Sequence, residues 1–395
     1  PVLFLAALVA AAAATGCKDS SGRSVDWFAA IKFPSGDSYA VFTPTSKDFE
    51  MSSKGLASGG AIVETLKQVY DGTASSYVMF NDETPDGTKS TTYGHTKGVA
   101  GWSSRGGFYL VHSIPRFPPK KSDGYSFPQS GSDNGQSFLC ISMSKTELEK
   151  VGDQWQYNRP QYYDTGDVDV TSISASVSGT HYSGTTGPTN NLVSITSSGG
   201  RSFDYFAKTA WWGKDIYSDF IAPTYKANLI SETWQNGVGP LPSECTDTYH
   251  VLNANEVEFV GTSWSETKDH SKWCVTDGGS TDRVCIGDIN RQHGQMNRGG
   301  GMLCLDGDIH TPFQDAIVGD DKCSGSYSYD VQHSDATPDH PANTANILSR
   351  ANIAIIALGS VGIALLFAGM VLFIVHRYRT QPEPLLSLQS ESVAV

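Results

Sequence analysis

Two short motifs in the sequence place a lysine two residues after a histidine, and both residue types suit phosphate chemistry. The motifs are His95-x-Lys97 and His270-x-Lys272. In an extended strand, residues i and i+2 face the same way, so each pair can project together. Imidazole is a nucleophile and a proton carrier near its pKa of about 6.5, and lysine offers a compact positive charge for a phosphate oxygen. Two such pairs facing each other predict a metal-independent phosphodiesterase site.

The paired motifs also predict different catalytic roles for the two histidines. One histidine attacks phosphorus and forms a phosphohistidine, while the other protonates the leaving alkoxide and then activates water. Each motif is followed by an apolar segment that a polar side chain closes, His112 in the first half and Asn290 in the second. With the two lysines, these side chains are predicted to stabilise charge on the non-bridging oxygens. Which histidine is the nucleophile stays open.

Each motif taken alone has a simpler interpretation, a surface histidine beside a solvated lysine. Other residues suggest weaker sites. Arg298 precedes three glycines that could wrap a phosphate, although a glycine turn before a strand is the favoured interpretation. Trp234 could stack on bases, with core packing as the favoured alternative.

The charge balance bears on the kind of substrate. The chain of 395 residues has a formal net charge of −13 at pH 7, which disfavours phosphate binding at neutral pH. Carboxylates gain protons and the ten histidines gain charge as the pH falls towards about 5, so an acidic compartment would weaken repulsion of DNA. The alternative is that the acidity only aids solubility.

Two apolar segments predict the membrane topology. Residues 1–16 resemble the apolar region of a signal peptide, so the mature chain is expected to start near Cys17. Residues 353–375 carry no charge and are long enough to cross a bilayer as a helix. Basic residues follow directly, which places the C-terminus in the cytosol and predicts a single-pass type I membrane protein. A removed lipid-anchor signal is the weaker alternative, because a polar tail follows the apolar segment.

Composition divides the remaining chain. Residues 60–70 predict a helix with Ile62, Leu66 and Val69 on one face, and residues 76–80 and 107–111 predict buried strands. The expected parts are a first half at 17–165, a Ser/Thr/Gly-rich insert, linker or exposed hairpin at 166–200, a second half at 201–330, a stalk at 331–352, the membrane helix at 353–375 and a cytosolic tail at 376–395.

The seven cysteines fit an oxidising compartment, where disulfide bonds are the default. Because seven is odd, at least one thiol is expected to be free or paired elsewhere. None of the spacings is CxxC, so a zinc site is not expected.

Several of these segments resemble the deoxyribonuclease II family. They are CKDSSGRSVDWFAAIKF (17–33), YGHTKGV (93–99), GGFYLVHSIPRFPP (106–119), GQSFLCIS (135–142), DHSKWCV (269–275) and VCIGDINRQHGQMNRGGGMLC (284–304). The likeness covers nearly all of residues 17–325 except the insert, and the motifs occur in the family's order.

The resemblance implies an α/β (α+β) fold of the phospholipase D-like type, a pseudo-dimer of two related halves with mixed β-sheets flanked by helices. It implies cleavage of DNA at acid pH without a metal or other cofactor, leaving 3′-phosphate ends, in lysosomes, endosomes or phagosomes. The family's catalytic residues fall on His95, Lys97, His270 and Lys272, and its supporting positions on His112 and Asn290. By analogy, the disulfides are Cys17–Cys140, Cys245–Cys323 and Cys285–Cys304, with Cys274 free beside the active site.

Two other functions remain as alternatives. A phospholipase D-type lipid phosphodiesterase fits the predicted membrane helix, and a non-catalytic membrane receptor would use the same fold. The receptor hypothesis expects the loss of a motif residue, and all four are present. The expected partner is DNA, with one C-terminal helix as the membrane anchor, while the oligomeric state and any base preference stay open.

Overall fold

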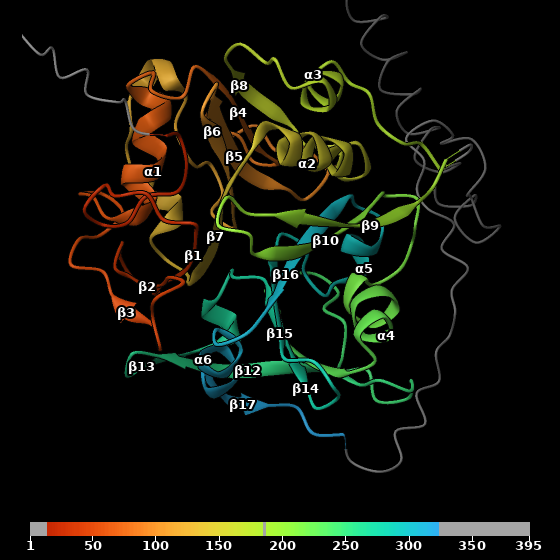
Figure 1. The fold of residues 1–395 in the computed structure, drawn as a ribbon. Coiled ribbons are helices and arrows are strands. Elements are labelled where there is room, and N and C mark those ends of the chain that lie inside the picture. Colours follow the sequence, from red (N-terminus) through yellow and green to blue (C-terminus); the bar gives the residue numbers. More distant parts are fainter. Residues whose placement is uncertain (1–13, 185–186, 324–395) are drawn as a thin grey trace, which may run out of the picture. The chain divides into compact units, whose positions relative to one another are not determined.

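Two β-sheets dominate the computed structural model, which describes residues 14–184 and 187–323 (Figure 1). The described residues belong to one structural unit. The stalk, membrane helix and tail predicted at 331–395, and all but the last three residues of the predicted signal peptide, lie outside them. Within the ranges that are described, no helix is both long enough and apolar enough to span a bilayer.

The first sheet is built by residues of the first half. Its strands are β1 (Trp27–Lys32), β2 (Tyr39–Phe42), β3 (Glu50–Met51), β4 (Ser76–Asn81), β5 (Lys97–Ser103), β6 (Gly106–His112), β7 (Gln136–Met143) and β8 (Tyr162–Thr165). They lie in the order β3-β2-β1-β7-β6-β5-β4-β8. All of these pairs are antiparallel, so the expectation of mixed sheets is wrong for this one. Most of its strands are buried, because both faces are covered.

The second sheet has nine strands, and it is a mixed sheet because one pair of its strands is parallel. Its strands are β9 (Asn190–Thr196), β10 (Ser202–Lys208), β11 (Asn228–Glu232), β12 (Val251–Phe259), β13 (Thr262–Ser265), β14 (Trp273–Asp277), β15 (Arg283–Gly287), β16 (Gly300–Asp306) and β17 (Ile317–Asp320). The order is β13-β12-β11-β14-β15-β16-β10-β9, and β17 pairs with β12. Only the pair of β11 with β12 is parallel among these strands.

The central strand orders of the two sheets correspond. The run β1-β7-β6-β5-β4 of the first sheet matches β10-β16-β15-β14-β11 of the second, with antiparallel pairing throughout both runs. Each His-x-Lys motif leads into a corresponding strand, β5 in the first sheet and β14 in the second. This correspondence puts both motifs at equivalent sheet ends.

Helices cover the sheets and seal the core. They are α1 (Ala61–Tyr70), α2 (Lys145–Asn158), α3 (Thr171–Val177), α4 (Ala222–Tyr225), α5 (His293–Met296) and α6 (His310–Asp315), with short turns η1 (Lys121–Asp123), η2 (Gln129–Gly131), η3 (Tyr217–Ile221, a π-helix) and η4 (Glu266–Lys268). The predicted face of α1, Ile62, Leu66 and Val69, is fully buried, which confirms that prediction. The strands predicted at 76–80 and 107–111 are confirmed as β4 and β6.

One of three apolar clusters among the described residues is shared by both sheets and α2. It joins Tyr109 of β6 and Trp155 of α2 to Trp273 of β14, all almost fully buried. Ser144 caps the N-terminus of helix α2, and its hydroxyl accepts a hydrogen bond from the Glu147 amide. Burial of each large apolar side chain stabilises the fold by about 1.5–3 kcal/mol, so this shared core ties the two sheets together.

The Ser/Thr-rich segment at 166–200 contains regular structure. Residues 171–177 form α3, which packs on α2, and residues 190–196 form β9, which pairs with β10. Figure 1 shows α2 and α3 side by side above β9 and β10. In this position the segment extends the second sheet and helps to place the C-terminal end of α2.

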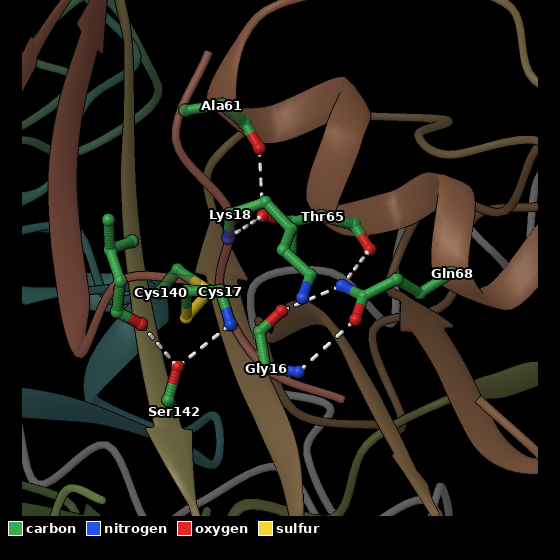
Figure 2. The surroundings of a disulfide bond; sticks show 9 residues. Gly16, Cys17, Lys18, Ala61, Thr65, Gln68, Cys140 and Ser142 are labelled. Atoms are coloured by element: carbon green, nitrogen blue, oxygen red, sulfur yellow. Dashed lines mark hydrogen bonds between the residues drawn. A yellow bond between two sulfur atoms is a disulfide. The ribbon is translucent and has the colours of Figure 1, made fainter. Parts of the chain in front are cut away.

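Three disulfides are present, with the pairing that the family resemblance implies. They are Cys17–Cys140, Cys245–Cys323 and Cys285–Cys304, and Cys274 is free and buried. Figure 2 shows the first of them, where the N-terminal segment is held against β7 and α1. There the Cys17 amide donates to Ser142 Oγ (2.8 Å), and Gly16 exchanges two hydrogen bonds with the side chain of Gln68.

Candidate active site

Both His-x-Lys motifs open into one cavity of about 250 Å³. It lies where the strand ends of the two sheets meet, and residues of both halves line it. The lining residues are Asp82, Glu83, His95, Lys97, Ser113, Pro115, Trp234, Gly237, His270, Lys272, Asn290, Gln292, Gln295 and Arg298. The prediction that the two motifs share one site is therefore met in the structure.

The first histidine is held by backbone groups of the second half. His95 lies just before β5, and its amide donates to the carbonyl of Gly299 (2.8 Å). Its Nδ1 lies 2.5 Å from the carbonyl oxygen of Asp288, which can only accept, so Nδ1 carries the hydrogen. In neutral His95 the lone pair is therefore on Nε2. Burial, and then the charge of Lys97, lower the pKa of His95 well below its ordinary value, which favours this neutral form.

A carboxylate organises the cations around His95. Asp82 forms ion pairs with Lys97 and with Arg298, whose Nη1 lies 3.0 Å away, and it sits 3.8 Å from Nε2 of His95. Burial by itself raises the pKa of Asp82, but the charges of Lys97 and Arg298 outweigh it and hold the pKa well below the ordinary range. Asp82 is thus ionised at acid as well as at neutral pH, and it orients two cations towards the cavity.

Arg298 forms hydrogen bonds with the loop that carries His95. Its guanidinium donates to the backbone carbonyls of Ser90, Tyr93 and Gly94 at 2.9–3.2 Å, as well as to Asp82. The loop before Arg298 is braced in turn by the buried amine of Lys208, which donates to three carbonyls. The glycine turn expected here is not formed, because Gly300 and Gly301 are the first residues of β16, whereas Arg298 itself lines the cavity.

The second histidine has a different environment. The His270 amide donates to the carbonyl of Gly135 in the first half (2.8 Å), and its ring packs against Trp234 in a T-shaped arrangement with centroids 4.0 Å apart. His270 Nε2 is buried without a hydrogen-bond partner in the described part of the chain. Burial first, then Lys272 and Lys97, lower the pKa of His270 to about 3. An anion in the cavity would offset those charges and let this ring accept a proton.

Lys272 is buried and has no carboxylate partner among the described residues. Its amine donates to the backbone carbonyl of His270. Burial, and then the nearby charge of Lys97, lower the pKa of Lys272 to about 7. A buried ammonium with spare donors is a favourable group for a phosphate oxygen.

The two supporting residues differ in position. Asn290 lines the cavity, and its Oδ1 has no hydrogen-bond partner within the described ranges. It lies three residues after the end of β15 at Gly287, so it does not close that strand as expected. His112 does end β6, but it is not among the lining residues; it packs against Phe117 and Phe138.

Sequence reasoning missed Asp82 and the neighbours that hold each histidine. Asp82 directly follows the buried strand β4, at the same sheet end as Lys97, and that position was the available signal. Gly135 and Gly299 each stand just before a central strand, and their carbonyls bind the histidine of the other half. Side chains at Gly299 would collide with the Asn158 carbonyl, 2.3 Å from an added Cβ.

Comparison with known proteins defines the family. The model of the family described as deoxyribonuclease II matches residues 16–323. Plancitoxin-1 of Acanthaster planci is 35% identical over 346 residues, which cover 82% of this chain and 96% of the relative. Deoxyribonuclease-2-alpha of Mus musculus is 36% identical over 327 residues (76% and 92%), and deoxyribonuclease-2-beta of Homo sapiens is 33% identical over 346 (82% and 96%).

These matches and the site define the class of protein as a nuclease. The chain belongs to the deoxyribonuclease II family.

Proposed function

We propose that the cavity hydrolyses DNA phosphodiester bonds at acid pH without a metal ion, and leaves 3′-phosphate ends. The observation that carries the proposal is the contrast between the two rings. His95 has its hydrogen on Nδ1 and its lone pair on Nε2, whereas His270 presents a buried Nε2 without a partner in the described part of the chain. One ring is prepared as a nucleophile, and the other is free to donate a proton to a substrate.

The first chemical step forms a covalent intermediate. Nε2 of His95 attacks phosphorus, and the bond from phosphorus to the 5′-oxygen breaks. Protonated His270 gives its proton to that oxygen, which leaves as a hydroxyl. Lys97, Lys272 and the Asn290 amide face the same cavity and stabilise the charge on the non-bridging oxygens.

The second step releases the product. Neutral His270 takes a proton from water, the hydroxide attacks phosphorus, and the bond to His95 Nε2 breaks. The 3′-phosphate leaves, and His270 is protonated again for the next cycle. Because the cycle starts from protonated His270, whose pKa is lowered in the free protein, activity requires acid pH.

The cellular location is proposed on separate grounds. We propose a single-pass membrane protein with its catalytic part in the lumen of lysosomes, endosomes or phagosomes. The support is the apolar segment at 353–375 with basic residues after it, together with three disulfides, which form in oxidising compartments. We further propose that the corresponding strand orders reflect a phospholipase D-like pseudo-dimer.

A plasmid assay tests the function. The full chain, purified in detergent, is incubated with supercoiled plasmid and excess EDTA at about pH 5 and about pH 7.5. Nicking and linearisation at the acid pH only, with 3′-phosphate ends that block extension by a polymerase until phosphatase is added, would support the proposal. No cleavage at the acid pH, or dependence on added metal, would overturn it. Phosphatidylcholine vesicles in parallel test the lipid phosphodiesterase alternative.

A further inference from the structure

A second cavity lies beside the segment that carries His95, where Tyr93 lines it. Its volume is about 160 Å³. The residues that line it are Tyr93, Arg159, Pro160, Tyr162, Ser176, Val177, Gly179, Thr180 and His181. Tyr93 and His95 are two residues apart, so the chain between them spans at most about 7 Å. That distance is roughly the rise of two nucleotides along a DNA strand, at about 3.4 Å each.

Arg159 connects this cavity to the active site. It ends α2 in a left-handed conformation (φ 53°), and its carbonyl accepts a hydrogen bond from the Gly94 amide (2.8 Å). Its guanidinium lies 5.1 Å from the centre of the Tyr93 ring, and Nη1 donates to the Thr92 carbonyl (3.1 Å). The guanidinium is thus held in place directly beside the loop of the nucleophile.

The charge of Arg159 is not neutralised within the described part of the chain. No carboxylate there pairs with it, and one of its five N–H donors is used, in the bond to Thr92. Arg298 and Arg291, by contrast, each bind an aspartate. An oriented and unpaired arginine beside a phosphodiesterase site, in a chain with a net charge of −13, calls for an anionic ligand.

His181 faces the same cavity from the segment after α3. Its Nδ1 lies 2.8 Å from the Gly179 carbonyl, which can only accept, so Nδ1 carries a hydrogen and the rest of the exposed ring is open to solvent. Arg159 and His181 therefore line one space from two separate elements, and the guanidinium, together with the imidazole in its protonated form, can donate to a phosphate oxygen.

We propose that this second cavity binds a non-scissile backbone phosphate of the same DNA strand, within one or two nucleotides of the bond that is cut. This inference rests on the proposed nuclease function and extends it. The planar guanidinium of Arg159 binds the phosphate and is held in place by Tyr93, and Nε2 of His181 adds a donor when that ring is protonated. The contact involves no base, so it adds affinity without sequence preference.

Two substrates separate this role from a structural one. One is an oligodeoxynucleotide with several phosphates, and the other is the nitrophenyl ester of thymidine 3′-phosphate, which carries only the reacting phosphate. We expect Arg159→Gln to raise KM and lower kcat/KM about tenfold on the oligonucleotide, and to reduce the slope of log(kcat/KM) against log(salt) by about 1. Hydrolysis of the small ester should be unchanged.

Matched variants complete the test. Arg159→Lys should recover the salt slope but only part of the rate, because lysine keeps the charge and loses the fork. His181→Gln should show a smaller loss with the same substrate selectivity. Arg105→Gln, an equal charge change in the turn between β5 and β6 at the far end of β5 from Lys97, should leave both substrates unaffected.

The outcomes are distinct. Equal losses on both substrates would show that Arg159 only positions the His95 loop, and an unchanged salt slope would show that no phosphate binds there; either result overturns the inference. A wild-type protein that cleaves neither substrate would instead refute the proposed function.

Discussion

The two halves of the site use the same motif in opposite ways. His95 is fixed by the Asp288 carbonyl on one nitrogen and has Asp82 3.8 Å from the other. The ring of His270 packs against the indole of Trp234, and its Nε2 has no partner among the described residues. Lys97 pairs with a carboxylate, whereas the amine of Lys272 donates to a backbone carbonyl and has no carboxylate partner in the described ranges. Similar backbones therefore hold two chemically different histidines.

One position accounts for much of this difference. Asp82 directly follows Asn81, the residue that pairs with Lys97 across β4 and β5. Extending the register of β11 and β14 by one step puts Trp234 in the same place relative to Lys272. A carboxylate on one side and an indole on the other give the two rings different electrostatic surroundings. The comparison teaches that a repeated motif acquires distinct roles through its neighbours.

The largest expected effect comes from separating the two histidines. With the nitrophenyl ester of thymidine 3′-phosphate, the leaving group needs no acid, so His270→Ala should release one equivalent of nitrophenol in a burst and then stall as a phosphohistidine. His95→Ala should give no burst. On DNA both variants should lose about 10²–10⁴-fold or more in rate. Stopped-flow absorbance and the mass of the trapped protein measure this.

The reverse pattern, a burst with His95→Ala, would exchange the two roles. Circular dichroism of both variants serves as the control for folding.

The next largest effect, on stability and on kcat, is expected for Asp82, which has no acidic counterpart at the equivalent position of the second half. Asp82→Asn leaves Lys97 and Arg298 without their carboxylate, so we expect about 3 kcal/mol lower stability and a fall in kcat. The pKa of Asp82 is depressed, so its contribution is present above its unfolded value of about 3.9 and is lost only below it. The destabilisation should therefore be similar at about pH 5 and about pH 7.5. Denaturant unfolding measures it, and a loss confined to neutral pH would contradict the assignment.

A third prediction concerns ligand binding and pH. His95, His112 and His270 all have lowered pKa values, so the folded protein loses stability as the pH falls below their unfolded value of about 6.5. Phosphate in the cavity supports protonation of His270 and offsets part of that loss. Inorganic phosphate should therefore raise Tm more at about pH 5 than at about pH 7.5. Sulfate serves as the matched control. Equal increases in Tm at both pH values would argue against coupling between phosphate binding and protonation of His270.

The smallest effect is expected for Glu232, a buried acid in the second half whose equivalent position in the first half is apolar. Glu232 occupies the place of Phe80 in the first sheet, and neither carboxyl oxygen has a partner in the described part of the chain. Burial, and then Asp269, raise its pKa well above the ordinary value, so its stability contribution is present below about pH 4.3 and is lost as the pH rises. Glu232→Gln should stabilise the protein by about 1–2 kcal/mol at neutral pH and little at about pH 4.5. Destabilisation at neutral pH would show an unrecognised partner.

Local patterns were sufficient for part of the fold and of the site. The periodicity of α1 and the apolar runs of β4 and β6 follow from burial of regularly spaced side chains, which is a local property. The four motif residues were identified because histidine and lysine carry recognisable chemistry. Asp82 was not, because aspartate is common at strand ends, and core packing was favoured for Trp234 because tryptophan is common in cores.

The sequence by itself determined the two motifs, the cysteine framework through family likeness, and the apolar segments near both ends of the chain. Only the tertiary structure decided which groups surround each motif. Gly299, Asp288 and Arg298 act on His95 from about 200 residues away, and Gly135 acts on His270 in the same manner. The physical reason is that the proton position and the pKa of a buried imidazole depend on its contacts, and those contacts cross between the halves.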